Sequence, residues 1–226
     1  MIVGCCHKFT QEVEINWEAV TAIGTAALAV ITVALAIIAI RQLADVKKFN
    51  EDSKVLSNVQ LAENMILKQI EFHYKIVERI EMSQKDAFKS MYENLTANFG
   101  FSIKTTQPEM GIQIHEAYKK LFQDHGHLLG HYFRNLYRIF KKIDEIKING
   151  FSNENKKSHA KLVRAQLSEY EVLLLFYNGI WIGDGDKFKH LMEQYELLEG
   201  INYDKLINRD EHPNLYLNSA YGNELA

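Results

Sequence analysis

The segment from Asp124 to Lys142, DHGHLLGHYFRNLYRIFKK, gathers histidines and arginines densely enough to support chemistry. His127 and His131 are four residues apart, which is the spacing at which two imidazoles on one helix can ligate the same metal ion. Arg134 and Arg138 share that helix face, however, and fixed positive charge opposes cation binding. The segment therefore predicts no metal site. It predicts a basic face that is either simply solvated or binds an anion or an acidic partner.

A helix from about residue 112 to residue 147, bent at Gly126 or Gly130, must present this face. Its apolar residues recur every three or four positions and form one broad stripe, made of Leu129, Tyr132, Phe133, Leu136, Ile139, Phe140 and Ile143. The basic side chains lie near the opposite pole: His127, His131, Arg134, Arg138 and Lys141. We expect the stripe to be buried and the basic face to be exposed.

The next predicted helix, from about residue 158 to residue 182, ends in the almost wholly apolar run VLLLFYNGIWI. A helix that is apolar all round is buried on several sides, so Glu171 at its start should be buried too. A buried ion costs several kcal/mol unless it is paired. We therefore expect Glu171 to pair with Arg134, Arg138 or Arg164, in an ion pair that fixes how the helices dock rather than one that catalyses a reaction.

A different segment, Ala19 to Ile40, carries no charge over twenty-two residues. As a helix it would extend roughly 33 Å, enough to cross a hydrocarbon core of about 30 Å. A buried core helix of a soluble protein is the alternative. The positive charges of Arg41, Lys47 and Lys48 outnumber Lys8 on the other side, so the positive-inside rule places residues 41–226 in the cytoplasm.

The expected fold is all-α, with a single N-terminal transmembrane helix, a long helix and a compact helical cytoplasmic domain. The parts are a short extracytoplasmic tail (1–16), the transmembrane helix (17–41), a long amphipathic helix or two helices in line (42–98), the compact helical domain (112–207) and a loosely ordered tail (208–226).

The distribution of charge also bears on partners. Residues 115–164 carry eleven Lys and Arg against five Asp and Glu, a net charge of +6, whereas residues 165–226 carry four against eleven, a net charge of −7. Mutual neutralisation of the two segments is favoured, and nucleic acid or anionic lipid is the alternative partner of the basic one.

Known cofactor motifs give no support for an enzyme. The sequence contains no glycine-rich phosphate loop, no G-x-S-x-G and no H-E-x-x-H. The run GDGD at 183–186 is followed by Lys187, Phe188 and Lys189, where a calcium loop needs oxygen ligands. The adjacent Cys5 and Cys6 cannot form a disulfide framework or a closed zinc site. We expect no cofactor.

Four blocks resemble the phage abortive-infection proteins of the AbiC-like family. They are KDAFKSMYENL (85–95), HYFRNLYRIFKKID (131–144), LVRAQLSEYEVLLLFYNG (162–179) and KFKHLMEQYELLEGI (187–201). The resemblance implies a role in bacterial antiviral defence, in which an infected cell stops growing or dies before the phage matures. It also implies a membrane span ahead of an abortive-infection-like domain.

The resemblance supplies no catalytic residue. It implies that the matching polar positions are the best candidates for a shared function, or else for shared architecture. With the two other basic residues of the same helix face, the candidate set is His127, His131, Arg134, Arg138, Arg164, Gln166, Ser168 and Glu171.

The leading hypothesis is a single-pass protein of the bacterial inner membrane that gives phage resistance by abortive infection. Its cytoplasmic domain would recognise a phage or host protein, with homo-oligomerisation and nucleic-acid binding left open. A defence-associated enzyme is the alternative, but helical HEPN-type ribonucleases need an arginine followed four to six residues later by histidine on one helix, and no arginine here has that spacing. A membrane-tethered scaffold outside defence is the third hypothesis.

Overall fold

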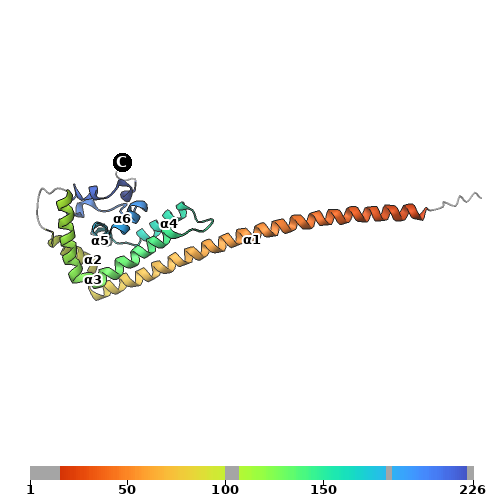
Figure 1. The fold of residues 1–226 in the computed structure, drawn as a ribbon. Coiled ribbons are helices and arrows are strands. Elements are labelled where there is room, and N and C mark those ends of the chain that lie inside the picture. The colour runs from red at the N-terminus through yellow and green to blue at the C-terminus, as the bar shows by residue number, and fades with distance from the viewer. Residues whose placement is uncertain (1–15, 100–106, 182–184, 223–226) are drawn as a thin grey trace, which may run out of the picture. The chain divides into compact units, whose positions relative to one another are not determined.

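The computed structural model describes residues 16–99, 107–181 and 185–222, and every regular element in these ranges is a helix (Figure 1). This confirms the all-α prediction for the described part of the chain. Cys5 and Cys6 lie outside it, as do most of the N-terminal tail and the first half of GDGD. The chain divides into two compact units, residues 1–54 and 55–226.

The described part of the first unit is the beginning of helix α1 (Trp17–Ser83). Every side chain from residue 16 to residue 54 is exposed, including the uncharged run Ala19–Ile40. Such a length of exposed apolar side chains is unfavourable in water, because little apolar surface is buried. By length and composition, α1 can cross a membrane, as expected from the sequence.

The rest of α1 belongs to the second unit, where it buries Ala62, Ile66, His73 and Ile80. The helix ends at Ser83, and helix α2 (Ala87–Ala97) begins after a short turn in which Asp86 has a φ of 54°. The segment 42–98 therefore contains the end of one helix and the whole of another, with a turn between them.

Helix α3 (Gln107–Glu145) carries the predicted stripe, and all seven of its apolar residues are at most 5% exposed. The helix packs against α2 and α5 of the second unit. Figure 1 shows α3 changing direction near its middle. A Cβ atom at Gly126 would lie 2.8 Å from the Phe122 ring, so a larger residue there would require that ring to move.

Residues 158–182, expected to form one helix, are divided between helix α4 (Asn153–Arg164) and helix α5 (Glu169–Ile180). The cause is a capping box, in which the Ser168 hydroxyl accepts from the backbone N–H of Glu171 and the Glu171 carboxylate accepts from the backbone N–H of Ser168. Helix α5 is buried from Glu171 to Gly179, as its apolar composition predicts, and packs against α2, α3 and helix α6 (Gly185–Gln194).

The C-terminal residues 208–222 are more ordered than expected, because they pack on the domain. They contain the short 3-10 helices η2 (His212–Leu215) and η3 (Asn218–Tyr221), which follow η1 (Tyr203–Lys205). The Tyr216 hydroxyl donates to the carbonyl of Phe176 in α5 at 2.6 Å, and Tyr221 is fully buried. Aromatic side chains thus bind this segment to the core.

Candidate functional site: a basic surface on helix α3

The basic face of α3 lies where the sequence predicts it. His127, His131, Arg134 and Arg138 are all exposed, opposite the buried apolar stripe. Helical periodicity positions them, because residues three, four or seven apart share one side of a helix. The four side chains therefore form one surface, which is available to solvent or to a partner.

All four residues line one pocket of about 500 Å³ between α3 and the end of α1, here called the histidine pocket. Helix α1 contributes Arg79, whose guanidinium adds a third fixed positive charge. The full set of lining residues is Phe72, Ile76, Arg79, Ile80, His127, Leu128, His131, Arg134, Asn135 and Arg138. None of these residues is acidic, so the pocket has a positive electrostatic character.

Arg134 and Arg138 also line a second pocket of about 430 Å³, here called the tryptophan pocket. Its described lining residues are Phe122, Gly130, Phe133, Arg134, Tyr137, Arg138, Lys141, Asn178, Trp181, Lys187 and Phe188. The rings of Phe122 and Trp181 lie 4.9 Å apart in its wall. The two arginines thus belong to both pockets, one of which is rich in histidine and the other in aromatic rings.

The arginines of this surface are not neutralised within the described part of the protein. Arg79, Arg134 and Arg138 form no ion pair and no side-chain hydrogen bond with any described residue. Only Lys141 has an acidic neighbour, Glu145, with 3.7 Å between Nζ and Oε1, and both side chains are about half exposed. Such an exposed pair contributes little, so most of the positive charge remains available to an anion.

A buried polar pair, Asn135 and His73, adjoins the histidine pocket, which Asn135 also lines. The Asn135 side-chain amide lies 3.1 Å from His73 Nδ1, and both residues are at least nine-tenths buried. Burial lowers the pKa of His73 to about 4, so its imidazole is neutral at pH 7. With an uncharged His73, the amide of Asn135 can donate to Nδ1 and hold the floor of the pocket in place.

Glu171 lies in the core, as predicted, but its expected partner was wrong. Its carboxylate accepts a hydrogen bond from the Tyr132 hydroxyl at 2.9 Å and from the backbone N–H of Ser168 at 2.8 Å. Among the described residues no arginine pairs with it. Burial raises the pKa of Glu171, and the hydrogen bonds from Ser168 and Tyr132 act in the opposite direction. Hydrogen bonds, rather than a counter-ion, therefore satisfy this carboxyl group.

Three further candidates lie at the junction of α4 and α5. Arg164 donates from Nη2 to the backbone carbonyl of Glu199, Gln166 is an exposed residue of the turn, and Ser168 is the N-cap of α5. With Glu171, these residues shape a helix junction. The structure thus separates the eight candidates into four that lie on the basic surface of α3 and four that belong to this junction.

Mutual neutralisation of the basic and acidic segments occurs elsewhere, on α4. Lys157 Nζ lies 3.0 Å from Glu196 Oε1, and Lys161 Nζ lies 3.4 Å from Glu196 Oε2 and 3.6 Å from Glu199 Oε2. The predicted attraction between the two segments is therefore present at α4. It does not involve Arg134 or Arg138, which have no ion-pair partner among the described residues.

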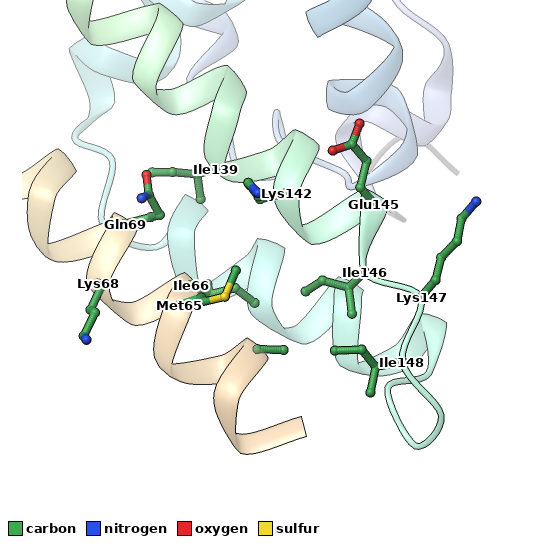
Figure 2. Close-up of a pocket in the computed structure, with 11 residues that line it drawn as sticks. Met65, Ile66, Lys68, Gln69, Ile139, Lys142, Glu145, Ile146, Lys147 and Ile148 are labelled. Carbon is green, nitrogen blue, oxygen red and sulfur yellow. The ribbon is translucent and has the colours of Figure 1, made fainter. Parts of the chain in front are cut away.

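A third pocket, of about 540 Å³, lies between α1 and the end of α3, and its character is apolar. Figure 2 shows Met65 and Ile66 of α1 facing Ile146 and Ile148, while Lys68 points away from the pocket. Arginines and histidines are absent from its lining residues, and Glu145 is present. This pocket therefore differs in chemistry from the two that share Arg134 and Arg138.

The described residues of the site offer positive charge and aromatic rings. Within residues 16–99, 107–181 and 185–222, no three His, Cys, Asp or Glu side chains come together in a way that could hold a metal ion. His127 and His131 line the same pocket, but the groups around them include three arginines. This arrangement can bind an anion by direct charge pairing and guanidinium hydrogen bonds.

Sequence reasoning missed the residues that other elements bring to the surface. Arg79 and Phe72 come from α1, and Trp181 follows α5, so all three are distant in sequence from the basic face. A helical wheel of α3 alone cannot find them. The sequence does show an arginine at position 79. Whether the Arg79 side chain faces α3, however, depends on how α1 packs, and the sequence pattern does not determine that packing.

Comparison with known proteins bears on residues 124–206, which match the family model putAbiC, described as "Putative phage abortive infection protein". Comparison with curated proteins and with solved structures gave no significant match. The matched region contains all eight candidate residues, including the four on the basic surface of α3. Through residues 124–206, the chain is therefore matched to the family of phage abortive infection proteins, which confirms the resemblance found in its sequence.

Proposed function

We propose that this chain is a membrane-anchored antiphage defence protein of bacteria that acts by abortive infection. Residues 17–41 span the inner membrane once, and residues 42–226 lie in the cytoplasm. The segment 112–207 is the abortive-infection-like domain, and the two pockets that share Arg134 and Arg138 are the surface with which it recognises a phage or host component.

The observation that carries this proposal is the overlap of the family match with the basic surface. The match to the abortive infection family covers residues 124–206, and the four exposed basic residues of α3 lie inside it. A protein that only needed a stable helical core would not require, around two pockets, three arginines that have no ion-pair partner among the described residues. Their placement favours recognition of an acidic partner.

Membrane anchoring is supported by a separate observation. The uncharged run Ala19–Ile40 is helical, and all of its side chains are exposed within its unit. In water this surface would promote aggregation, whereas in lipid it is in its preferred environment. Arg41, Lys47 and Lys48 follow the run directly and support a cytoplasmic location for the rest of the chain.

The test is phage plating on bacteria that express the full chain or carry an empty vector, over a broad panel of phages. We expect fewer plaques on expressing cells for at least one phage. At a high ratio of phage to cells, the infected culture should stop growing and release few progeny, because abortive infection removes the infected cell. Equal plaque counts across the panel would contradict the proposal, and survival of the infected cells would contradict its mechanism.

A further inference from the structure

We propose that the two pockets on α3 together bind a single strand of nucleic acid. This inference deepens the proposed function, because it names the chemical class of the component that the basic surface recognises. The phosphates would lie along the arginines, and a base would enter the tryptophan pocket.

The first support is the layout of charge. Arg134 and Arg138 line both pockets, Arg79 extends the positive charge into the histidine pocket, and Lys187 extends it into the tryptophan pocket. The positive charge therefore spans two adjoining pockets rather than one point. A single phosphate would need one such group of cations, whereas a strand presents phosphates in series along its backbone.

The second support is the aromatic character of the tryptophan pocket. Trp181, Tyr137 and Phe122 line it and are each partly exposed. Trp181 is held in place by ring contacts of 4.9 Å to Phe122 and 5.3 Å to Tyr118. Proteins that bind single strands combine a basic groove with aromatic side chains on which bases stack, and this pair of pockets has both parts.

The third support is a buried amide in the same pocket. Asn178 is 8% exposed, and its Nδ2 donates to the Tyr118 hydroxyl at 2.8 Å. Its amide oxygen has no hydrogen-bond partner in the described part of the chain, and the residue lines the tryptophan pocket. An amide oxygen can accept from the exocyclic amine of a base, so the pocket can read a base edge as well as stack on it.

The absence of acidic groups distinguishes this surface from the rest of the domain. No described lining residue of either pocket is Asp or Glu, although the segment 165–226 is strongly acidic. The lysines of α4 pair with Glu196 and Glu199, whereas the arginines of α3 have no such partner among the described residues. A polyanion is therefore the partner that the charge pattern of α3 fits.

The test uses the full chain, purified in uncharged detergent, with Trp17 replaced by Phe. The sequence has two tryptophans, so Trp181 becomes the only source of indole fluorescence. We expect a short single-stranded RNA to quench this fluorescence, because a base stacks on or beside the indole. Binding should weaken steeply with salt, with a slope of about −0.7 for each phosphate that is neutralised.

The matched variants are Arg134→Glu with Arg138→Glu and, as control, Lys119→Glu with Lys120→Glu. Both pairs reverse two exposed positive charges on α3, but Lys119 and Lys120 line neither pocket. We expect the arginine pair to weaken RNA binding at least roughly tenfold and to reduce the salt slope, while the lysine pair leaves both nearly unchanged. An unchanged circular dichroism spectrum would show that both variants are folded.

Several outcomes would overturn the inference. These are no binding at low salt, equal weakening by both variant pairs, or quenching by a mononucleotide at the same concentrations as by the strand. Quenching by micelles that contain phosphatidylglycerol, and not by RNA, would identify the ligand as a lipid headgroup instead. Plating is a separate measurement, so RNA binding without phage resistance would contradict the defence role and leave this site standing.

Discussion

At the scale of single residues, the buried polar side chains and the exposed basic side chains of α3 have different roles. Tyr132 and Asn135 point into the core, where they bind Glu171 and His73 respectively. These four residues are each at most 8% exposed, so their hydrogen bonds are matters of stability. The basic residues on the other face are exposed, and no such requirement fixes their type. Substitutions in the two groups should therefore separate stability from function.

Glu171 gives the first prediction. Replacing Glu171 with Ala leaves the Tyr132 hydroxyl and the backbone N–H of Ser168 without their acceptor, and we expect a loss of about 3 kcal/mol in the free energy of unfolding. In Glu171→Gln, the amide oxygen can still accept from the backbone N–H of Ser168, and the amide NH2 can donate to the Tyr132 hydroxyl oxygen. This substitution also removes a buried charge, so its effect should be about 1 kcal/mol or less. Denaturant unfolding of the purified protein measures both. A similar loss in the two variants would show that the charge itself is needed.

The buried histidines give the second prediction, which concerns pH. Burial lowers the pKa of His73 and of His212 to about 4, from an ordinary value of 6.5. As the pH falls from 6.5 towards 4, the unfolded chain takes up protons that these folded histidines do not, so the free energy of unfolding should decrease by up to roughly 3 kcal/mol per histidine. Glu171 opposes this trend, because its raised pKa favours the folded state at lower pH.

A variant isolates the contribution of one histidine. We expect His73→Gln to reduce the decrease in unfolding free energy between pH 6.5 and pH 4, because it removes the buried imidazole. Unfolding by denaturant at a series of pH values provides the comparison. An identical pH dependence in the wild type and in His73→Gln would rule out this role for His73.

At the scale of elements, α5 organises the domain, because helices and the C-terminal segment surround it. Its burial follows from the sequence, since the run VLLLFYNGIWI has no polar face. The exposed and buried faces of α3 also follow from the sequence, because helical periodicity alone decides them. The break between α4 and α5 was missed, although Ser168 and Glu171 have the S-x-x-E spacing of a capping box. Apolar residues recur at helical spacing on both sides of Ser168, and this recurrence alone predicts one continuous helix.

Close packing around α5 gives the third prediction. A Cβ atom at Gly179 would lie 2.9 Å from Met192 Sδ and closer still to the Tyr216 hydroxyl, which is itself held by the carbonyl of Phe176. We expect Gly179→Ala to reduce the free energy of unfolding by about 1–3 kcal/mol, because the C-terminal segment must move. Gly111→Ala is the matched control, since no atom lies within 4 Å of its Cβ position and alanine favours a helix. Equal stability of the two variants would contradict this packing.

At the scale of the whole molecule, helix α1 begins in the first unit with the uncharged run and continues into the second unit, which contains the basic surface of α3. The apolar run and the family resemblance are visible in the sequence, because each depends on neighbouring residues. The histidine pocket could not be predicted in full, since Arg79 and Phe72 reach it only through the packing of α1 against α3. Likewise, the aromatic residues of C-terminal segment 208–222 find partners in α5 that no local pattern reveals.

Membrane anchoring gives the fourth prediction. Arginine at the centre of a span costs about 2.5–3.5 kcal/mol, so Ile31→Arg with Leu35→Arg should move the protein from the membrane fraction to the soluble or aggregated fraction. Both side chains are exposed, so the substitutions should not disturb protein packing. Leu56→Arg, at an exposed position outside the uncharged run, should stay in the membrane fraction. Cell fractionation followed by immunoblotting distinguishes these outcomes, and an unchanged distribution of the double variant would exclude residues 17–41 as the anchor.

We propose that the basic surface of α3 is what this protein uses against phage. The most direct test of this proposal is the efficiency of plating on cells that express the wild type, Arg134→Glu with Arg138→Glu, or Lys119→Glu with Lys120→Glu, at equal protein levels in the membrane. We expect the arginine pair to abolish protection and the lysine pair to retain it, because only the arginines line the two pockets. Full protection by the arginine variant against every phage that the wild type restricts would contradict the account.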